Sequence, residues 1–224
     1  MRHSIALLIA AAVLVAAACS SGPSAPDEGS YVDRIAAERA NKEKMFRESS
    51  DSPIPRGRHD EFLPLSYFPV DPSYSVPAVL ELSADRPTFE IPTSTGKLRK
   101  MERVGVLEFT LKGETLSLGA FVDAGTTRIG RLFVPFSDLT TGTETYAAGR
   151  YLVDLDPTAT GIYEIDFNRA YSPYCAYNDS YDCPYPPSSN RLKVPIRAGE
   201  RTRTSATASA LRQGSGQAAA TDPR

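Results

Sequence analysis

A group of polar side chains in the second half of the chain has the residue types needed to bind a ligand or to exchange protons. Arg150 follows a connection that contains Asp138 and Glu144, and Asp166 and Asn168 end a later apolar run. An arginine flanked by carboxylates can hold an anion or a polar sugar, or it can position one carboxylate as a general acid or base. The candidate binding surface comprises Asp138, Glu144, Tyr146, Arg150, Asp166, Asn168, Tyr171, Asn190 and Arg191.

The same residues also have a structural interpretation. In it, Arg150 pairs with Asp166 to fix a strand crossing, and Asn168 caps the turn before the next loop. Tyr146 and Tyr171 then pack as aromatics and do not stack on a ligand. An enzyme would instead require a cavity that collects these side chains and a carboxylate with a raised pKa. No catalytic residue is assigned.

The N-terminus predicts export. Residues Ile5 to Ala17 form an unbroken apolar run, and small residues lead directly into Cys19. Thirteen apolar residues in a helix cover only about 20 Å, which is too short for a bilayer core of about 30 Å, so this is a secretory signal. The cysteine after small residues resembles a bacterial lipobox. That resemblance implies cleavage before Cys19 and its modification with lipid, and two or three acyl chains anchor a protein stably.

Composition divides the rest of the chain. The predicted boundaries are a lipoprotein signal peptide over 1–18, a flexible tether over 19–30, a β-rich domain over 31–200 and a disordered tail over 201–224. The tether and the tail are small, polar and rich in Gly, Pro, Ser or Ala, so they cannot bury enough apolar surface to fold. Roughly 170 residues remain, enough for one domain with a core of its own.

The segment Asp166 to Leu192 has no helical or strand period, but it contains five tyrosines and two cysteines. Cys175 and Cys183 lie eight residues apart, and an exported protein matures where thiols oxidise. A disulfide is therefore predicted, and closing a ring of about nine residues would stabilise the fold by roughly 2.5 kcal/mol. Free thiols are the alternative. We expect this loop to form a lid or platform.

The domain begins with one helix and continues as strands. The segment Tyr31 to Ser49 places Tyr31, Ile35, Ala36, Ala40 and Phe46 near one side, which predicts an amphipathic helix that packs across a sheet. Ser30 is its expected N-cap.

From Leu63 onward the apolar period is two, and nine short runs rich in β-branched and aromatic residues alternate with turn residues. In residues 104–111, Gly105, Leu107, Phe109 and Leu111 should face the core while Val104 faces outward. A tight hairpin is expected at Lys112 to Glu114. The predicted fold is mainly β: an antiparallel β-sandwich or a partly open β-barrel with one N-terminal amphipathic helix.

Several function classes lack support in the sequence. The formal net charge is −2 with basic and acidic residues interspersed, so no nucleic-acid partner is expected. His59 is the one histidine of the predicted domain, which leaves a zinc site short of ligands, and no metal or cofactor is predicted. The sequence has no GxSxG elbow, and Ser94 to Lys97 lacks the upstream glycine of a phosphate loop.

Several segments together resemble one family, the bacterial domain of unknown function 1684. These segments are YFPVD at 67–71, PFSDLTTGTETYAAGRYL at 135–152, DFNRAYSPYCAY at 166–177, CPYPPSSNRL at 183–192 and AGE at 198–200. They span nearly the whole domain. The resemblance implies no activity, since the family's name records none.

We therefore predict a cell-envelope protein that is exported and held at a membrane by lipid at Cys19. Its expected function is a non-catalytic binding or structural module, with a small polar ligand or an envelope glycan as possible partner and no predicted protein partner. The alternative is a hydrolase or transferase on such a glycan or small polar substrate, with Glu144 or Asp166 as acid or base and Arg150 as anion clamp.

Overall fold

The computed structural model describes residues 28–127 and 129–203. The predicted signal peptide over 1–18, Cys19, and the predicted tail from residue 204 lie outside this part of the chain. Among the described helices, none combines the length and the apolar character that crossing a membrane requires.

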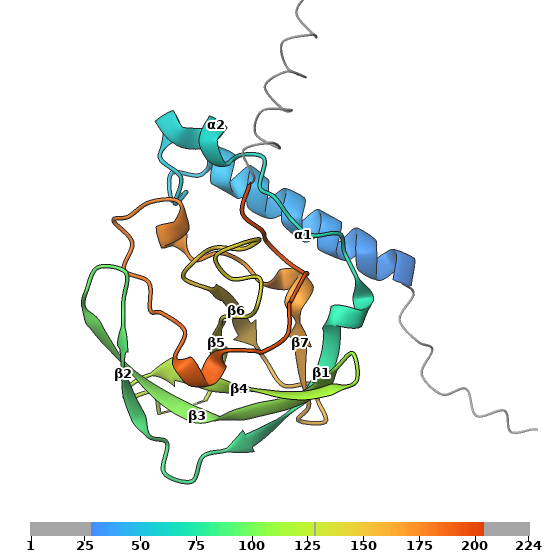
Figure 1. Cartoon of the computed structure of the whole chain (residues 1–224), viewed down its shortest axis with the longest axis vertical. Coiled ribbons are helices and arrows are strands. Elements are labelled where there is room, and N and C mark those ends of the chain that lie inside the picture. Colours follow the sequence, from blue (N-terminus) through green and yellow to red (C-terminus); the bar gives the residue numbers. More distant parts are fainter. Residues whose placement is uncertain (1–27, 128, 204–224) are drawn as a thin grey trace, which may run out of the picture.

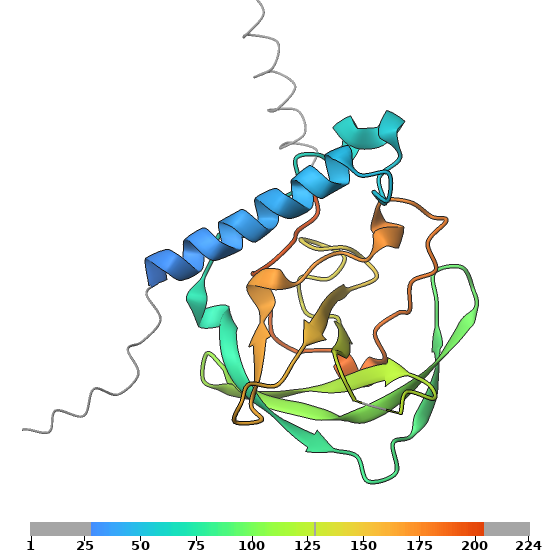
Figure 2. The ribbon, with the colours of Figure 1, turned by 180° about the vertical axis from the view of Figure 1, so that it is seen from behind.

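The domain is built on a strongly curled antiparallel sheet. Its strand order is β6-β5-β4-β3-β1-β7, and β2 pairs with β3 outside this path. Curling turns the sheet into a half-barrel, whose open side is visible in Figures 1 and 2. The mainly β fold is therefore confirmed, in the form of a partly open barrel. The strands are β1 (Ser75–Leu82), β2 (Thr88–Pro92), β3 (Leu98–Leu111), β4 (Glu114–Asp123), β5 (Leu132–Phe136), β6 (Arg150–Leu155) and β7 (Tyr163–Asp166).

The helices are short apart from the first one, which lies across the open side of the half-barrel (Figure 1). They are α1 (Glu28–Glu48), η1 (Arg56–Arg58), α2 (His59–Phe62), η2 (Pro72–Tyr74), η3 (Phe167–Arg169), η4 (Tyr174–Ala176) and η5 (Ser188–Asn190), where η marks a single 3₁₀ turn.

Strand β3 shows how alternation in the sequence creates the core. Leu107 and Phe109 are buried, as predicted, and Glu108 between them is exposed. Val104 was expected to face outward but is fully buried. The reason is that the β3–β4 register shifts between Arg103 and Gly105, and such a bulge changes which residues face inward.

The β3–β4 hairpin is tighter than predicted. Leu111 pairs with Glu114, so the loop contains only Lys112 and Gly113, with φ of 50° and 87°. Two central residues with positive φ are typical of a type I′ turn, whose twist matches that of the flanking strands. Glu114, expected in the turn, is the first residue of β4.

Two of the nine expected strands do not pair as strands. The segments 65–71 and 191–197 each make only a single isolated bridge. Pro69 and Pro195 interrupt them, and a proline cannot donate a hydrogen bond to a neighbouring strand. The later segment still belongs to the core, because Ile196 is fully buried inside the half-barrel.

Helix α1 begins earlier than predicted. Its first residue is Glu28, so Ser30 lies inside the first turn instead of capping it. Ala36 and Ala40 are exposed, so the apolar side of the helix is narrower than the sequence suggested.

A single stripe of α1 contacts the domain. Tyr31, Ile35 and Phe46 are buried on it, as predicted. Arg39 and Lys42 lie between them and also turn inward, where Arg39 donates to two loop carbonyls and Lys42 to a buried carboxylate. The helix therefore packs on the loops that follow β7 and precede β1 through both apolar and charged contacts.

The contacts of the domain continue three residues beyond its predicted end. The Arg201 N–H donates to the carbonyl of Ser66 at 2.9 Å. Arg203 Nη1 donates to the carbonyls of Asp60, Glu61 and Leu63 at 3.0 to 3.2 Å. Residues 201–203, which were assigned to the tail, belong to the folded domain.

Candidate functional site

The predicted binding surface does not converge on one site, and Arg150 shows why. Its side chain and that of Asp138 are both 0% exposed, and Arg150 Nη2 lies 3.0 Å from Asp138 Oδ2. A buried pair of this kind is retained only with good geometry and further hydrogen bonds. Arg150 therefore has a structural partner, but that partner is Asp138 and not the predicted Asp166.

The remaining Arg150 donors hold the C-terminal segment in place. Nη1 donates to the carbonyls of Ala198 at 2.5 Å and Glu200 at 3.2 Å, and Nη2 donates to that of Ile196 at 2.8 Å. Burial lowers the pKa of Arg150, an effect that Asp138 opposes. With both terminal nitrogens occupied, this guanidinium cannot clamp an anion from solvent.

The Asp138 carboxylate is equally occupied. Its Oδ1 accepts hydrogen bonds from the Thr140 N–H at 2.7 Å, the Thr140 hydroxyl at 2.6 Å and the Ile196 N–H at 3.2 Å. Charge-assisted bonds of this type satisfy a carboxylate that has left water. Asp138 and Arg150 together connect the loop after β5 to residues 196–200.

Glu144 belongs to a different contact at the surface. Arg197 Nε lies 3.0 Å from each of its carboxylate oxygens, and both side chains are partly exposed. An exposed pair of this kind contributes little to stability, typically about 0–1 kcal/mol. Glu144 does not share a ligand site with Arg150.

Asp166 and Asn168 tie α1 to the end of β7. The Tyr31 hydroxyl and the Asn168 N–H both donate to Asp166 Oδ1 at 2.9 Å. The Asn168 amide in turn donates to the Tyr31 hydroxyl at 2.9 Å and the Asp71 carbonyl at 2.8 Å. The cap of η3 is thus the Asp166 side chain, not Asn168 as expected.

Burial raises the pKa of Asp166, although the bonds from Tyr31 and Asn168 act in the opposite direction. Its Oδ2 is buried without a hydrogen bond, and Arg169 Nε lies 3.6 Å away. A raised carboxylate pKa is one feature expected of an acid or base. An acid or base must also face a cavity that can hold the substrate, and Asp166 does not line any of the three cavities described below.

The last two predicted residues behave differently from each other. Asn190 is fully buried and joins β4 to β5: its Oδ1 accepts from the Gly119 N–H at 2.8 Å, and its Nδ2 donates to the carbonyls of Gly119 and Pro135. Arg191 is exposed beside it. Apart from Tyr171, the predicted surface is therefore a set of structural contacts and surface side chains.

The predicted disulfide is not formed in the structure. Cys175 and Cys183 are buried free thiols, and the Cys175 N–H donates to Cys183 Sγ at 3.2 Å. The Cys183 thiol lowers the pKa of Cys175 to about 6, whereas the same contact and burial raise the pKa of Cys183. Tyr146 donates its hydroxyl to Cys175 Sγ at 3.9 Å and is half-buried, so it packs as the structural interpretation predicted. The loop that contains the two cysteines is instead held by hydrogen bonds to Ser94.

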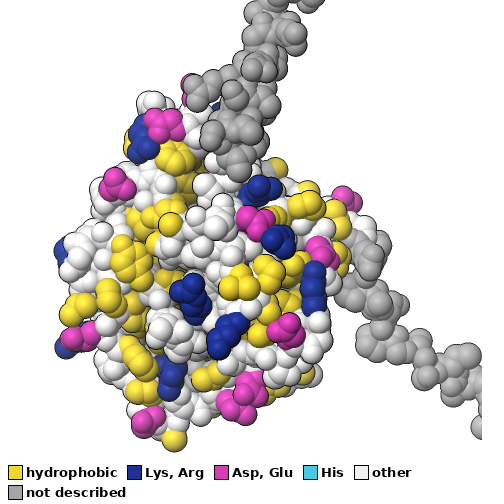
Figure 3. Space-filling view, viewed as in Figure 1, with side chains coloured by type: hydrophobic (Ala, Val, Ile, Leu, Met, Phe, Trp, Pro, Cys, Tyr) yellow, Lys and Arg dark blue, Asp and Glu magenta, His cyan; other side chains and the backbone are white. Residues whose placement is uncertain are grey.

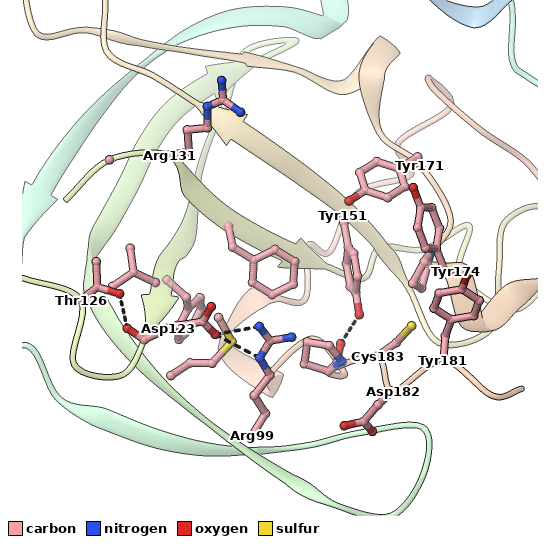
Figure 4. A pocket seen from close by; sticks show the side chains of 17 residues that line it. Arg99, Asp123, Thr126, Arg131, Tyr151, Tyr171, Tyr174, Tyr181, Asp182 and Cys183 are labelled. Carbon is pink, nitrogen blue, oxygen red and sulfur yellow. Dashed lines mark hydrogen bonds and ion pairs between the residues drawn. The ribbon is translucent and has the colours of Figure 1, made fainter. Parts of the chain in front are cut away.

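A pocket that the sequence did not predict lies between the curled sheet and this loop. Its volume is about 510 Å³. Met101 of β3, Phe121 of β4 and Phe133 form an apolar side, and residues 171–184 form the opposite wall. Figure 4 shows Tyr171, Tyr174 and Tyr181 together on that wall, with Asp123 and Thr126 on the other side and Arg99 between them. Cavities of this size and character commonly bind small molecules.

The β2–β3 turn holds the tyrosine wall in position. The Ser94 N–H donates to the Cys183 carbonyl at 2.9 Å, and the Ser94 hydroxyl accepts from the Cys183 N–H at 3.0 Å. Ser94 also donates to the Tyr181 carbonyl at 2.8 Å, and the Tyr151 hydroxyl donates to the Pro184 carbonyl at 2.5 Å. These contacts make the loop a fixed platform without a covalent crosslink.

The aromatic rings of the pocket orient one another. Tyr151 makes edge-to-face contacts with Phe133 at 4.8 Å and with Tyr171 at 5.9 Å between ring centroids. Tyr174 and Tyr181 form another such pair at 5.3 Å. Each contact adds roughly 0.5–1.5 kcal/mol beyond area burial, so the rings are arranged before any ligand arrives.

Both arginines that line this pocket form ion pairs with aspartates, whereas Asp182 accepts from the Thr95 hydroxyl. Arg99 Nη2 lies 2.7 Å from Asp123 Oδ1, and Arg131 Nε lies 3.9 Å from Asp156 Oδ2. In Figure 4 the Arg131 side chain points away from the Arg99–Asp123 pair. Basic and acidic side chains are also interspersed on the face shown in Figure 3, which has no large patch of one sign.

Two smaller cavities lie near α1. They measure about 180 and 130 Å³. Glu200, which sequence reasoning missed, lines the larger of them, and its carboxylate accepts from Lys42 at 2.7 Å and from the Tyr177 hydroxyl. Both oxygens of this buried carboxylate are paired, so Glu200 joins α1 to the loop that contains Tyr177.

Of the nine residues of the candidate binding surface, only Tyr171 lines the large pocket, and Cys183, predicted as half of a disulfide, lines it as well. The residues that were missed come from three distant parts of the sequence, and each reads as an ordinary strand or loop residue on its own. The five tyrosines between residues 171 and 185 were the available signal. Tyrosine combines an apolar ring with a polar hydroxyl and is enriched where proteins bind other molecules.

Comparison with known proteins agrees with this fold. Residues 60–201 match the family described as "Protein of unknown function (DUF1684)". A solution NMR structure of an uncharacterized protein of Haloarcula marismortui is 40% identical in sequence, with a TM-score of 0.61, and the match covers 79% of this chain and 96% of that chain. No curated protein matches. The matched residues include all seven strands and the tyrosine wall, and the chain belongs to the DUF1684 family.

Proposed function

We propose that this chain is a non-catalytic binding module whose ligand occupies the tyrosine-lined pocket. The observation that supports it is the cavity of about 510 Å³, with aromatic and apolar walls and a few polar groups at its rim. Sites for small molecules have this composition, because apolar walls supply affinity and a few polar groups supply orientation. The edge-to-face contacts described above prepare the pocket for binding, which lowers the entropy cost of association.

The alternative, a hydrolase or transferase, depended on Arg150 acting with Glu144 or Asp166. Each of these three has a separate partner: Arg150 pairs with Asp138, Glu144 with Arg197, and Asp166 with Tyr31. Acid and base catalysis requires both groups within hydrogen-bond reach of the same substrate. We therefore favour binding without catalysis.

The second part of the proposal concerns location. We propose that the protein is exported and that lipid at Cys19 holds it on a membrane of the cell envelope. The apolar run that ends before Cys19 supports this, and residues 20–27 separate the modified cysteine from the first residue of α1. In this arrangement the pocket binds its ligand in the aqueous space beside the membrane.

A substitution that fills the pocket with a large side chain tests the binding role. Gly130 is exposed and lines the pocket, and a Cβ built on it meets nothing within 4 Å, so Gly130→Trp introduces a large ring at an open position. The probe is N-phenyl-1-naphthylamine, a neutral dye whose fluorescence rises in apolar cavities. We expect wild-type protein to enhance this fluorescence and Gly130→Trp to reduce the enhancement at least about tenfold, which corresponds to 1.4 kcal/mol.

Gly57→Trp is the matched control. Gly57 is exposed, lies outside the pocket, and also has nothing within 4 Å of an added Cβ. It should bind the dye like the wild type. Equal dye binding by all three proteins, with unchanged circular dichroism, would exclude the pocket as a binding site.

Fractionation of cells tests the anchor. Cys19→Ala removes the only sulfur to which the lipid can attach, and we expect the protein to move from the membrane pellet to the soluble fraction. Ser20→Ala, one residue further, should stay with the membrane. If Cys19→Ala fractionates like the wild type, lipid at this residue is not the anchor.

A further inference from the structure

We infer that the ligand of the tyrosine pocket is a neutral sugar whose ring lies against the tyrosine wall and whose neighbouring hydroxyls bridge Arg99 and Asp123. This inference rests on the proposed binding function and adds the chemical class of the ligand.

The first argument is charge. The charged residues that line the pocket are Arg99, Arg131, Asp123 and Asp182, two of each sign. Arg99 pairs with Asp123, and Asp182 accepts from the Thr95 hydroxyl at 2.5 Å. Because these four charges cancel, a charged ligand entering this pocket would lose hydration without meeting a net opposite charge, which is unfavourable. A neutral ligand avoids this cost.

The second argument is shape. Tyr171, Tyr174 and Tyr181 are half-buried, so each presents part of its ring to the pocket. In Figure 4 these three rings stand together on one side of the cavity. A pyranose has C–H groups on a face of its ring and hydroxyls around its edge. Tyrosine suits such a ligand, because it combines an apolar ring with a polar tip.

The third argument is hydrogen bonding at the opposite side. Arg99 Nε and Nη2 both donate to the same oxygen, Asp123 Oδ1, at 3.1 and 2.7 Å. Within the described part of the chain, Arg99 Nη1 and Asp123 Oδ2 have no hydrogen-bond partner, and both side chains are exposed. A donor thus stands beside an acceptor. Two adjacent hydroxyls supply the matching acceptor and donor.

A neutral heteroaromatic compound satisfies the first two arguments. It stacks on tyrosine and carries no charge, but its ring edge does not present paired hydroxyls to Arg99 and Asp123. The sugar therefore uses more of the groups that line this pocket, and the experiment below includes caffeine to represent the other class.

The test is saturation-transfer difference NMR on the folded protein with caffeine and with three sugars of one ring type. Methyl glucoside is neutral, glucuronic acid is anionic and glucosamine is cationic. We expect transfer to the ring C–H protons of methyl glucoside and at least about tenfold weaker binding of both charged sugars, the effect of 1.4 kcal/mol. Equal or stronger binding of a charged sugar would overturn the neutral assignment.

Variants locate the binding. Arg99→Met and Asp123→Asn should each raise the dissociation constant for methyl glucoside about tenfold or more, since each removes a charged hydrogen-bonding group that faces a sugar hydroxyl. Tyr181→Leu should also weaken binding, whereas Tyr185→Leu, outside the pocket lining, should not. Unchanged affinity in the Arg99, Asp123 and Tyr181 variants would overturn the sugar-binding arrangement.

The two levels of the proposal can fail separately. If Gly130→Trp blocks the dye but methyl glucoside shows no transfer, or if only caffeine does, the sugar assignment is wrong and the binding module remains. If neither the dye nor any sugar distinguishes Gly130→Trp from Gly57→Trp, the proposed function is wrong as well.

Discussion

Arg150 is the residue whose role differs most from what its sequence context suggests. Its neighbours along the chain include carboxylates and threonines, as in a ligand site. In the fold, its side chain is fully enclosed and donates to three carbonyls of the C-terminal segment and to Asp138. A buried guanidinium with this many partners determines where residues 196–200 pack.

Replacing Arg150 should therefore destabilise the domain strongly. In Arg150→Met, Asp138 remains buried without its counter-charge, and the loss of one partner of a buried pair costs about 3–5 kcal/mol. Arg197→Met removes an exposed partner of Glu144 and should cost less than about 1 kcal/mol. The free energies of unfolding in urea give the comparison. Equal losses in the two variants would contradict a structural role for Arg150.

Asp166 should give a measurable pH dependence. Because burial raises its pKa in the folded domain, the folded state binds this proton more readily than the unfolded state does. The resulting stabilisation is present below the unfolded pKa and is lost as the pH rises through the folded pKa. Asp166→Asn keeps an acceptor for Tyr31 and removes the buried charge.

The difference in free energy of unfolding, Asp166→Asn minus wild type, should therefore be larger at neutral pH and fall on acidification. Urea denaturation at several pH values measures it. Ala37→Ser, on an exposed part of α1, changes no ionisable group; it is the control and should show a nearly constant difference. A difference for Asp166→Asn that grows on acidification would have the wrong sign.

At the scale of elements, the docking of α1 depends on Phe46. Its ring is fully buried and meets Tyr177 at 5.3 Å and Tyr174 at 6.0 Å in edge-to-face contacts. Tyr174 also lines the pocket, so the helix supports the tyrosine wall from behind.

Phe46→Ala should destabilise the domain by about 3–5 kcal/mol, the usual effect of removing a buried phenylalanine side chain. Met45→Ala, at the exposed neighbouring position, should change stability by less than about 0.5 kcal/mol. Urea unfolding measures both. If the two variants unfold alike, α1 does not depend on this contact.

The sequence predicted the elements well where local pattern and tertiary packing agree. Alternation in β3 and the apolar stripe of α1 identified both elements and most of their buried residues. The inward turn of Val104 was not predictable, because a bulge depends on the register with β4. Residues 191–197 look like a strand, but they form an extended segment held by single backbone bonds of Leu192 and Val194 to the loop after β5 and by the Arg150 side chain.

At the scale of the whole molecule, the site was the least predictable feature. The pocket combines Arg99 of β3, Phe121 of β4 and the tyrosines after β7, which only the curled sheet brings together. The spacing of these residues along the chain does not indicate that they lie close together in the fold. The candidate residues chosen for their charge instead became the buried contacts that make the fold possible, since an enclosed charge must be paired.

The position of Arg150 in the chain also has a consequence for biosynthesis. Its carbonyl partners lie 46 to 50 residues further along, so the ribosome releases the arginine well before these partners exist. Until residues 196–200 have been synthesised, the Arg150 guanidinium has Asp138 as a partner but lacks these three carbonyls. We therefore expect the half-barrel to close around Arg150 only after this later segment has been made.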